Sequence, residues 1–124
     1  MRILVLSTDP ELALLRQHVL RNAGHETLAL SSDKEIEQGF EKLETNFDVA
    51  LLCHRVPDGR ARELIRRFLR INPRGKILAM VHLYGEWPQI EADRYVVGTD
   101  GPEALIRVMT EIAAERAAAA SSAN

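Results

Sequence analysis

Apolar residues along this chain follow two alternating patterns: short continuous runs, and longer stretches in which apolar positions recur with helical spacing. The runs at 2–7 and 76–82 show no alternation of apolar and polar residues, which is typical of strands covered on both faces in a parallel sheet. The run at 26–31 is of mixed polarity, as expected near a sheet edge. The strands predicted in this way are residues 2–7, 26–31, 47–53, 76–82 and 94–97.

The first two helices have clear starting signals. Asp9 is placed to cap a helix that has Pro10 at its first position and runs to about Asn22. Ser32 and Glu35 have the spacing of a capping box and open the second helix. The apolar positions expected to face the sheet are Leu12, Leu15, Val19 and Leu20 in the first helix, and Ile36, Phe40 and Leu43 in the second.

The remaining connections are less uniform. A loop at 55–59 precedes a third helix, marked by Ala61, Leu64, Ile65, Phe68 and Leu69 and ended by the segment 72–75. The segment 83–92 contains Gly85 and Pro88, which leave room for only one or two helical turns. The last helix opens at 100–103 and has the stripe Leu105, Val108, Met109 and Ile112.

Strands that alternate with helices predict right-handed crossovers and a parallel sheet with helices on both faces. The fold class is therefore α/β: a single doubly wound (βα)5 domain with strand order 2-1-3-4-5 and a truncated fourth helix. Residues 1–116 form the expected domain, and the Ala/Ser-rich residues 117–124 are a tail or a helix extension. In such sheets ligands bind at the carboxyl ends of the strands, near the switch point between the first and third strands.

Composition narrows the classes of function. The chain has 124 residues, one cysteine and a formal net charge of −2, and its apolar runs are too short to span a bilayer. The single Cys53 and the absence of a signal-peptide pattern predict the reducing cytoplasm. The charge disfavours a dedicated nucleic-acid or membrane-surface protein, so neither partner is expected.

Several segments resemble the receiver domains of two-component signalling, the CheY-like response-regulator family, over about residues 1–116. Residues 1–12 are similar to the opening strand and acidic turn of that family, and residues 47–59 to its third strand and Asp-x-x-Met-Pro-x-x-Gly turn. Residues 92–97 resemble its Ala-x-x-Tyr-x-x-Lys-Pro segment, and residues 101–105 the start of its last helix. The resemblance implies the CheY/flavodoxin-like fold and a bacterial phosphorelay setting.

Carried over residue by residue, the resemblance implies a degenerate phosphoacceptor pocket. The phosphoacceptor Asp falls on Cys53, the acidic pair that holds magnesium on Ser7 and Thr8, and the hydroxyl residue on Val81. The Lys-Pro pair falls on Gly98 and Thr99, and only Tyr95 matches, at the place of the switch aromatic. Magnesium needs oxygen ligands, usually carboxylates, and aspartyl phosphate formation needs a carboxylate nucleophile. We therefore expect a pseudo-receiver with no catalytic residue, no metal and no cofactor.

Three other interpretations of the strand ends remain. Cys53 is either a reactive thiol or an inert core residue, and no second cysteine is present to resolve an oxidised form. Cys53, His54, His82 and Asp9 are candidate transition-metal ligands, although their spacing is not a known ligand signature. The polar residues Ser7, Thr8 and Thr99, together with Gly98, are candidates to line a small anion pocket.

Charge and aromatic residues suggest partner surfaces. Residues 55–74 carry a local net charge of +5, and residues 33–48 a local net charge of −4. These charged segments have three interpretations: they are solvated helix faces, they attract one another, or they form a docking surface for a protein partner. Candidate interface residues are Tyr84, Trp87, Tyr95, Arg62 and Arg66.

The leading hypothesis is a non-phosphorylatable, non-enzymatic receiver-like module that binds a signalling protein or itself. The alternative is a small-ligand, metal or thiol-based sensor or enzyme that uses the strand-end pocket at Cys53.

Overall fold

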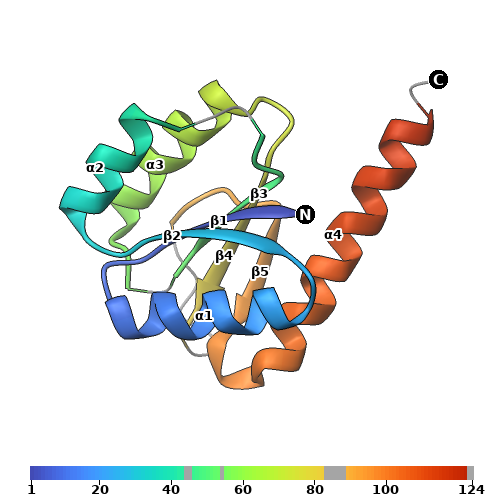
Figure 1. Cartoon of the computed structure of the whole chain (residues 1–124), viewed down its shortest axis with the longest axis horizontal. Coiled ribbons are helices and arrows are strands. Elements are labelled where there is room, and N and C mark those ends of the chain that lie inside the picture. The colour runs from blue at the N-terminus through green and yellow to red at the C-terminus, as the bar shows by residue number, and fades with distance from the viewer. Residues whose placement is uncertain (44–45, 54, 83–88, 123–124) are drawn as a thin grey trace.

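The computed structural model describes residues 1–43, 46–53, 55–82 and 89–122. Its strands are β1 (Arg2–Leu6), β2 (Glu26–Leu30), β3 (Val49–Leu52), β4 (Lys76–Val81) and β5 (Arg94–Val97). All pair in parallel, in the order β2-β1-β3-β4-β5 (Figure 1). The predicted fold class and strand order are thus confirmed.

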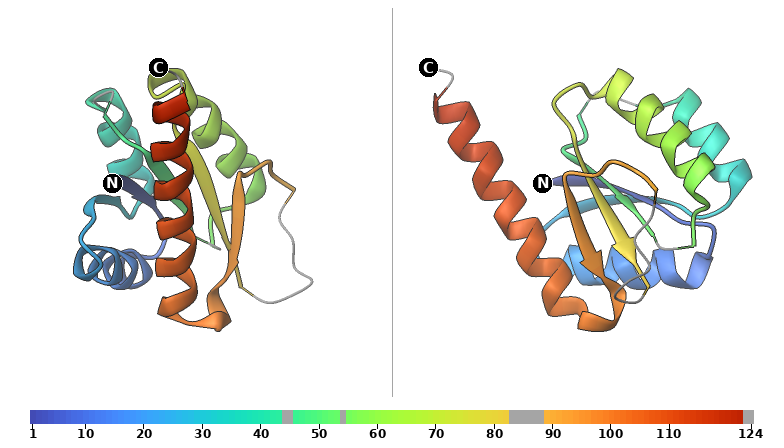
Figure 2. Two further views of the ribbon diagram at one scale, coloured as in Figure 1. Left: turned by 90° about the vertical axis from the view of Figure 1, so that its right-hand side faces the viewer. Right: turned by 180° about the vertical axis from the view of Figure 1, so that it is seen from behind.

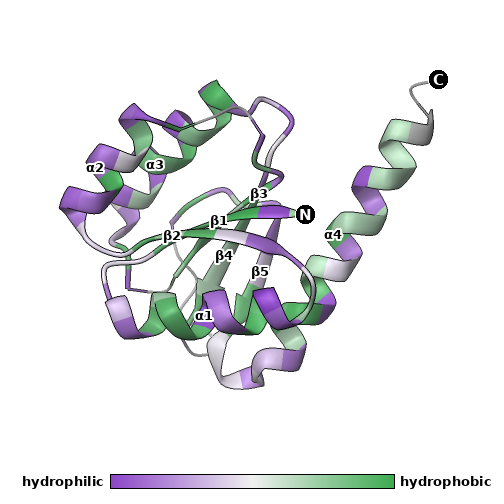
Figure 3. Cartoon of the chain, in the orientation of Figure 1, coloured by the Kyte–Doolittle hydropathy of each residue, from purple (hydrophilic) through white to green (hydrophobic). Residues whose placement is uncertain are grey.

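The helices cover both faces of the sheet (Figure 2). They are α1 (Pro10–Asn22), α2 (Asp33–Glu41), α3 (Asp58–Ile71) and α4 (Pro102–Ser122), with a short 3-10 turn η1 (Gly98–Asp100) before α4. Helices α1 and α4 pack on one face, where Leu20, Leu105 and Met109 lie against the sheet, and α2 and α3 pack on the other. Apolar colour follows the strands and the sheet-facing sides of the helices in Figure 3.

Helix starts agree with the capping predictions. The Asp9 carboxylate accepts hydrogen bonds from the backbone N–H groups of Glu11 and Leu12, at 3.0 and 3.3 Å. Ser32 accepts one from the backbone N–H of Glu35 at 3.1 Å. Each side chain satisfies amide groups that the first helical turn leaves without a partner.

Three local predictions are wrong. Helix α3 begins at Asp58 directly after Pro57, so the predicted loop 55–59 is shorter. Leu43 lies beyond the end of α2, although it still packs against the core, and Leu15 is 51% exposed, because α1 turns Ala13 toward the sheet beside the predicted Leu20. The truncated fourth helix is not among these and stays a prediction: the described residues 89–92 contain no helix, and the other positions predicted for it, 83–88, lie outside the described residues.

Helix α4 runs along the sheet and continues past its edge (Figure 1). Near the far end of the sheet Arg116 forms an ion pair with Asp48 at 2.9 Å and donates a hydrogen bond to the backbone oxygen of Arg74 at 2.6 Å. Beyond Arg116, residues 117–120 are exposed. The helix is therefore fixed to the end of the sheet opposite the predicted functional site.

Candidate functional site at the carboxyl ends of the strands

Ser7 and Cys53 lie side by side at the switch point of the sheet. Leu6 pairs with Leu52 across β1 and β3, so the two residues that follow are neighbours. The backbone N–H of Cys53 donates to the Leu6 oxygen at 3.0 Å, which extends the ladder by one step. Ser7 is fully buried and Cys53 is 3% exposed. The two positions where the receiver resemblance expects a metal-binding acid and the phosphoacceptor thus belong to the core.

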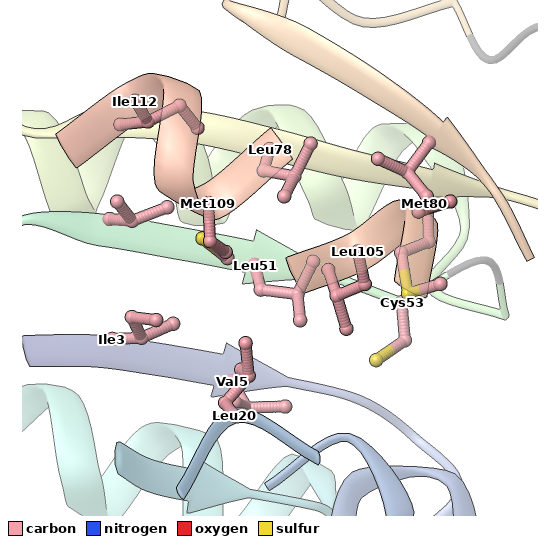
Figure 4. Packing of buried hydrophobic residues seen from close by; sticks show 13 residues of the cluster. Ile3, Val5, Leu20, Leu51, Cys53, Leu78, Met80, Leu105, Met109 and Ile112 are labelled. Carbon is pink, nitrogen blue, oxygen red and sulfur yellow. The ribbon is translucent and has the colours of Figure 1, made fainter. Parts of the chain in front are cut away.

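The Cys53 thiol is held mostly in its protonated form near neutral pH. Burial raises its pKa from an ordinary value of 9.0 to about 11, against smaller opposing effects of a hydrogen bond with Ser7 and the positive charge of Arg16. Its side chain lies among the apolar residues between α1, α4 and the sheet (Figure 4). The thiolate, which is the nucleophilic form, is therefore scarce near neutral pH.

Asp9 is the nearest carboxylate to follow β1, and both of its oxygens are engaged. Oδ1 caps α1, and Oδ2 forms an ion pair with Arg55 at 3.2 Å. The Thr8 hydroxyl donates to the backbone oxygen of Arg55 at 3.3 Å. The turns after β1 and β3 are thereby tied together, and Asp9 serves as a cap and an ion-pair partner. His54, between Cys53 and Arg55, lies outside the described residues.

A cleft of about 460 Å³ opens beside these turns. Gly98 lines it and lies close to Val81 and Arg16: a Cβ added to Gly98 would lie 3.5 Å from the Val81 oxygen and 3.7 Å from Nη2 of Arg16. Val81 itself is buried, and His82 is exposed at the rim. The cleft is lined by Asp9, Glu11, Leu12, Leu15, Arg16, Arg55, His82, Gly98 and Thr99.

Arg16 is one of the residues of this cleft that the sequence prediction missed. It reaches the cleft from α1, and its Nε is buried without a hydrogen-bond partner among the described residues. A signal was present in the sequence, because Arg16 stands four residues from both Leu12 and Leu20 and so interrupts their apolar stripe with a charge.

The charged faces of α2 and α3 largely neutralise one another. Glu37 of α2 accepts hydrogen bonds from Arg60 at 2.7 Å and from Arg67 at 2.9 Å, and both arginines also pair with Glu63. The two arginines hold the pKa of the Glu37 carboxyl below its ordinary range. Of the three explanations for the local charges, mutual attraction accounts for this inner part of the surface.

The outer side of α3 presents a second row of arginines at four-residue spacing, Arg62, Arg66 and Arg70, all exposed. Arg62 donates to the backbone oxygen of Gln89 at 2.6 Å, whereas Arg66 has no ion pair within the part of the chain that the structure describes.

Tyr95 is hydrogen-bonded to the segment between β4 and β5 that Arg62 also contacts. Its hydroxyl donates to the backbone oxygen of Ile90 at 2.7 Å and accepts from the backbone N–H of Ala92 at 3.3 Å, while the side chain stays 38% exposed. The candidate interface residues Arg62 and Tyr95 thus both hold the segment that precedes β5. The other two aromatic candidates, Tyr84 and Trp87, lie outside the described residues.

Two kinds of feature are absent from the part of the chain that the structure describes. No group of three or more His, Cys, Asp or Glu side chains is arranged to hold a metal ion within residues 1–43, 46–53, 55–82 and 89–122. No helix in that same part of the chain has the length and apolar character needed to cross a membrane.

Comparison with known proteins gives a likeness in structure alone. No protein-family model matches the chain, and no curated protein matches it in sequence. A response regulator receiver domain protein from Clostridium thermocellum superposes with a TM-score of 0.72 at 17% identity, over 93% of this chain and 95% of that one. The chain has the CheY-like receiver fold.

Two further solved structures share the receiver fold with this chain. The response regulator TrrA from Thermotoga maritima, in complex with Mg²⁺ and BeF, superposes with a TM-score of 0.71 at 21% identity, over 90% of this chain and 97% of TrrA. A putative pilus assembly protein, CpaE, from Burkholderia thailandensis reaches 0.72 at 16% identity, over 92% of this chain and 98% of CpaE.

Proposed function

We propose that this protein is a non-enzymatic, receiver-like signalling module that acts through contacts with a protein partner and does not take up phosphate on an aspartate. The observation that carries the proposal is the burial of Ser7 and Cys53 at the two positions where the receiver resemblance places a magnesium ligand and the phosphoacceptor. A carboxylate nucleophile is missing at residue 53, so an acyl phosphate has no atom on which to form.

The surrounding groups support the same proposal. Phosphoryl transfer relies on metal ions and cations placed around the reacting phosphate. Hard cations such as Mg²⁺ are held chiefly by oxygen ligands, and the Asp9 carboxylate is already occupied as a cap and by Arg55. Gly98 has no side chain to replace the lysine that the resemblance expects there.

The proposed partner surface lies around the connection into β5. Exposed Arg66, the partly exposed ring of Tyr95 and the anchoring Arg62 are its described members, and Tyr84 and Trp87 are proposed to complete it. Aromatic and arginine side chains are the types that most often dominate binding energy at protein interfaces. TrrA has been crystallised in complex with the histidine kinase ThkA, so a protein with this fold can bind a protein partner.

A capture experiment from the source cells tests the proposal. Immobilised wild-type protein should retain one defined partner, Trp87→Ala and Arg66→Glu should lose it, and Cys53→Ala should keep it. Arg21→Gln is the matched control, since Arg21 is an exposed arginine on α1 that hydrogen-bonds Thr27 of β2, at the opposite edge of the sheet from β5. Capture that is lost in Cys53→Ala but persists in Trp87→Ala and Arg66→Glu would favour a sensor that uses the strand-end pocket.

A further inference from the structure

The guanidinium of Arg16 is placed in a way that the fold does not explain. Its Nε is buried, yet Arg16 makes no hydrogen bond or ion pair within the described residues. Buried polar groups in native proteins nearly always have a hydrogen-bond partner, and a charged group without one is costly. A molecule bound in the cleft, which Arg16 lines, would supply such a partner.

The space next to Arg16 is open because residue 98 is glycine. An added Cβ at Gly98 would lie 3.7 Å from Nη2 of Arg16, so any larger side chain would grow beside the guanidinium. Arg16 thus points toward the end of β5 from α1, on the side of the cleft that Gly98 leaves empty.

The lining of the cleft restricts what such a partner is. An arginine guanidinium binds carboxylate and phosphate with two parallel hydrogen bonds. Asp9 and Glu11 also line the cleft, and Arg55 is already paired with Asp9. Arg16 therefore offers one positive charge without a direct partner, in a lining whose two carboxylates and two arginines balance, and this suits a singly charged anion better than a phosphate that carries nearly two charges.

The wall of the cleft next to Arg16 on α1 is partly apolar. Leu12 and Leu15 line it, and Leu15 is 51% exposed although it lies on the first helix beside the core. An aliphatic or aromatic body attached to the anionic group would cover this exposed leucine. Small-molecule sites commonly combine such an apolar wall with a few polar groups that fix the orientation of the ligand.

From these contacts we propose that the cleft binds a small organic monocarboxylate whose carboxylate pairs with Arg16 and whose apolar body lies on Leu12 and Leu15. The site is independent of the partner surface around Tyr95 and gives the module a small-molecule input. It goes beyond the proposed function and stands or falls separately from it.

Nuclear magnetic resonance titration of the labelled full-length protein tests the site. The probe is sodium 4-methylpentanoate, and its neutral isostere 4-methylpentan-1-ol and inorganic phosphate are titrated in parallel. We expect saturable shifts of the Arg16 Nε–H signal and of the amide signals of Leu12, Gly98 and Thr99. A ligand of this size should bind with a dissociation constant of about 1 mM.

Variants then assign the binding to the cleft. Arg16→Gln should lower the affinity for the probe at least about tenfold, which corresponds to the loss of one charged pair. Gly98→Val keeps the arginine but fills the space beside it and should also weaken binding. Arg107→Gln, an exposed arginine elsewhere, should bind the probe like the wild type.

Four results would overturn the inference. They are no saturation at concentrations well above 1 mM, equal binding of the neutral alcohol, stronger binding of phosphate than of the carboxylate, and unchanged affinity in both Arg16→Gln and Gly98→Val. The amide spectrum of each variant reports whether it is folded. If Arg16→Gln does not fold, Gly98→Val decides the question, because a Cβ at residue 98 makes only ordinary contacts.

Discussion

The reactivity of Cys53 toward a thiol reagent separates a core cysteine from a sensor cysteine. Burial raises the pKa of the thiol to about 11, compared with an ordinary value of 9.0. At pH 8 about one native molecule in a thousand then carries the thiolate, whereas about one in ten does so at the ordinary pKa. Ionisation alone therefore slows modification roughly a hundredfold, and the 3% exposure of the side chain slows it further.

The assay is the time course of reaction with 5,5′-dithiobis(2-nitrobenzoate) at pH 8, in native buffer and in guanidinium chloride. The matched control is Thr110→Cys in a Cys53→Ala background, because Thr110 is exposed on α4 and presents a thiol to solvent. We expect the native wild type to react at least about a hundredfold more slowly than this control. A rate within tenfold of the control would refute the description of Cys53 as an inert core residue.

Three further predictions concern stability. The pKa of Cys53 is raised in the folded protein, so its contribution to stability is complete below about pH 9 and is lost as the pH rises toward 11. In urea unfolding over that range, the wild type should lose up to about 3 kcal/mol more of its free energy of unfolding than Cys53→Ala. Equal losses in the two proteins would contradict this prediction. Arg16→Met removes a charged group whose Nε is buried without a partner, and should raise the free energy of unfolding by about 1 kcal/mol in the absence of ligand. A decrease in the urea midpoint would show that the wild-type Nε finds a partner. Asn72→Ala should cost about 1–3 kcal/mol, because Asn72 is 4% exposed and accepts the backbone N–H of Phe47 at 3.1 Å; an unchanged urea midpoint would show that this amide finds another partner.

The fold was predictable because local and long-range signals agree. Continuous apolar runs at β1 and β4 identify strands buried on both faces, and the caps at Asp9 and Ser32 fix where two helices begin. A parallel order with short connections leaves few topologies. The start of α3 was misplaced because Asp58 and Gly59 resemble turn residues, although they form its first turn.

The place of the candidate site in the fold was predictable, but the contacts of its residues were not. The register of β1 and β3 brings Ser7 and Cys53 together, as expected from the switch point. The role of Arg16 depends on the rotation of α1, which turns Ala13 inward and leaves Leu15 exposed, and a stripe of apolar residues does not fix that rotation. In the same way, the pairing of Glu37 with Arg60 and Arg67 depends on how α2 and α3 lie beside each other.

The most direct test of the proposed function is labelling by a small phosphodonor. The wild-type protein is incubated with acetyl phosphate and Mg²⁺, a receiver domain with an intact phosphoacceptor serves as the positive control, and intact masses are measured at once. With no carboxylate at residue 53 and with Asp9 held by Arg55, the protein should gain no phosphoryl mass while the control is labelled. A Mg²⁺-dependent gain of one phosphoryl group would show that another residue accepts phosphate and would contradict the proposed function.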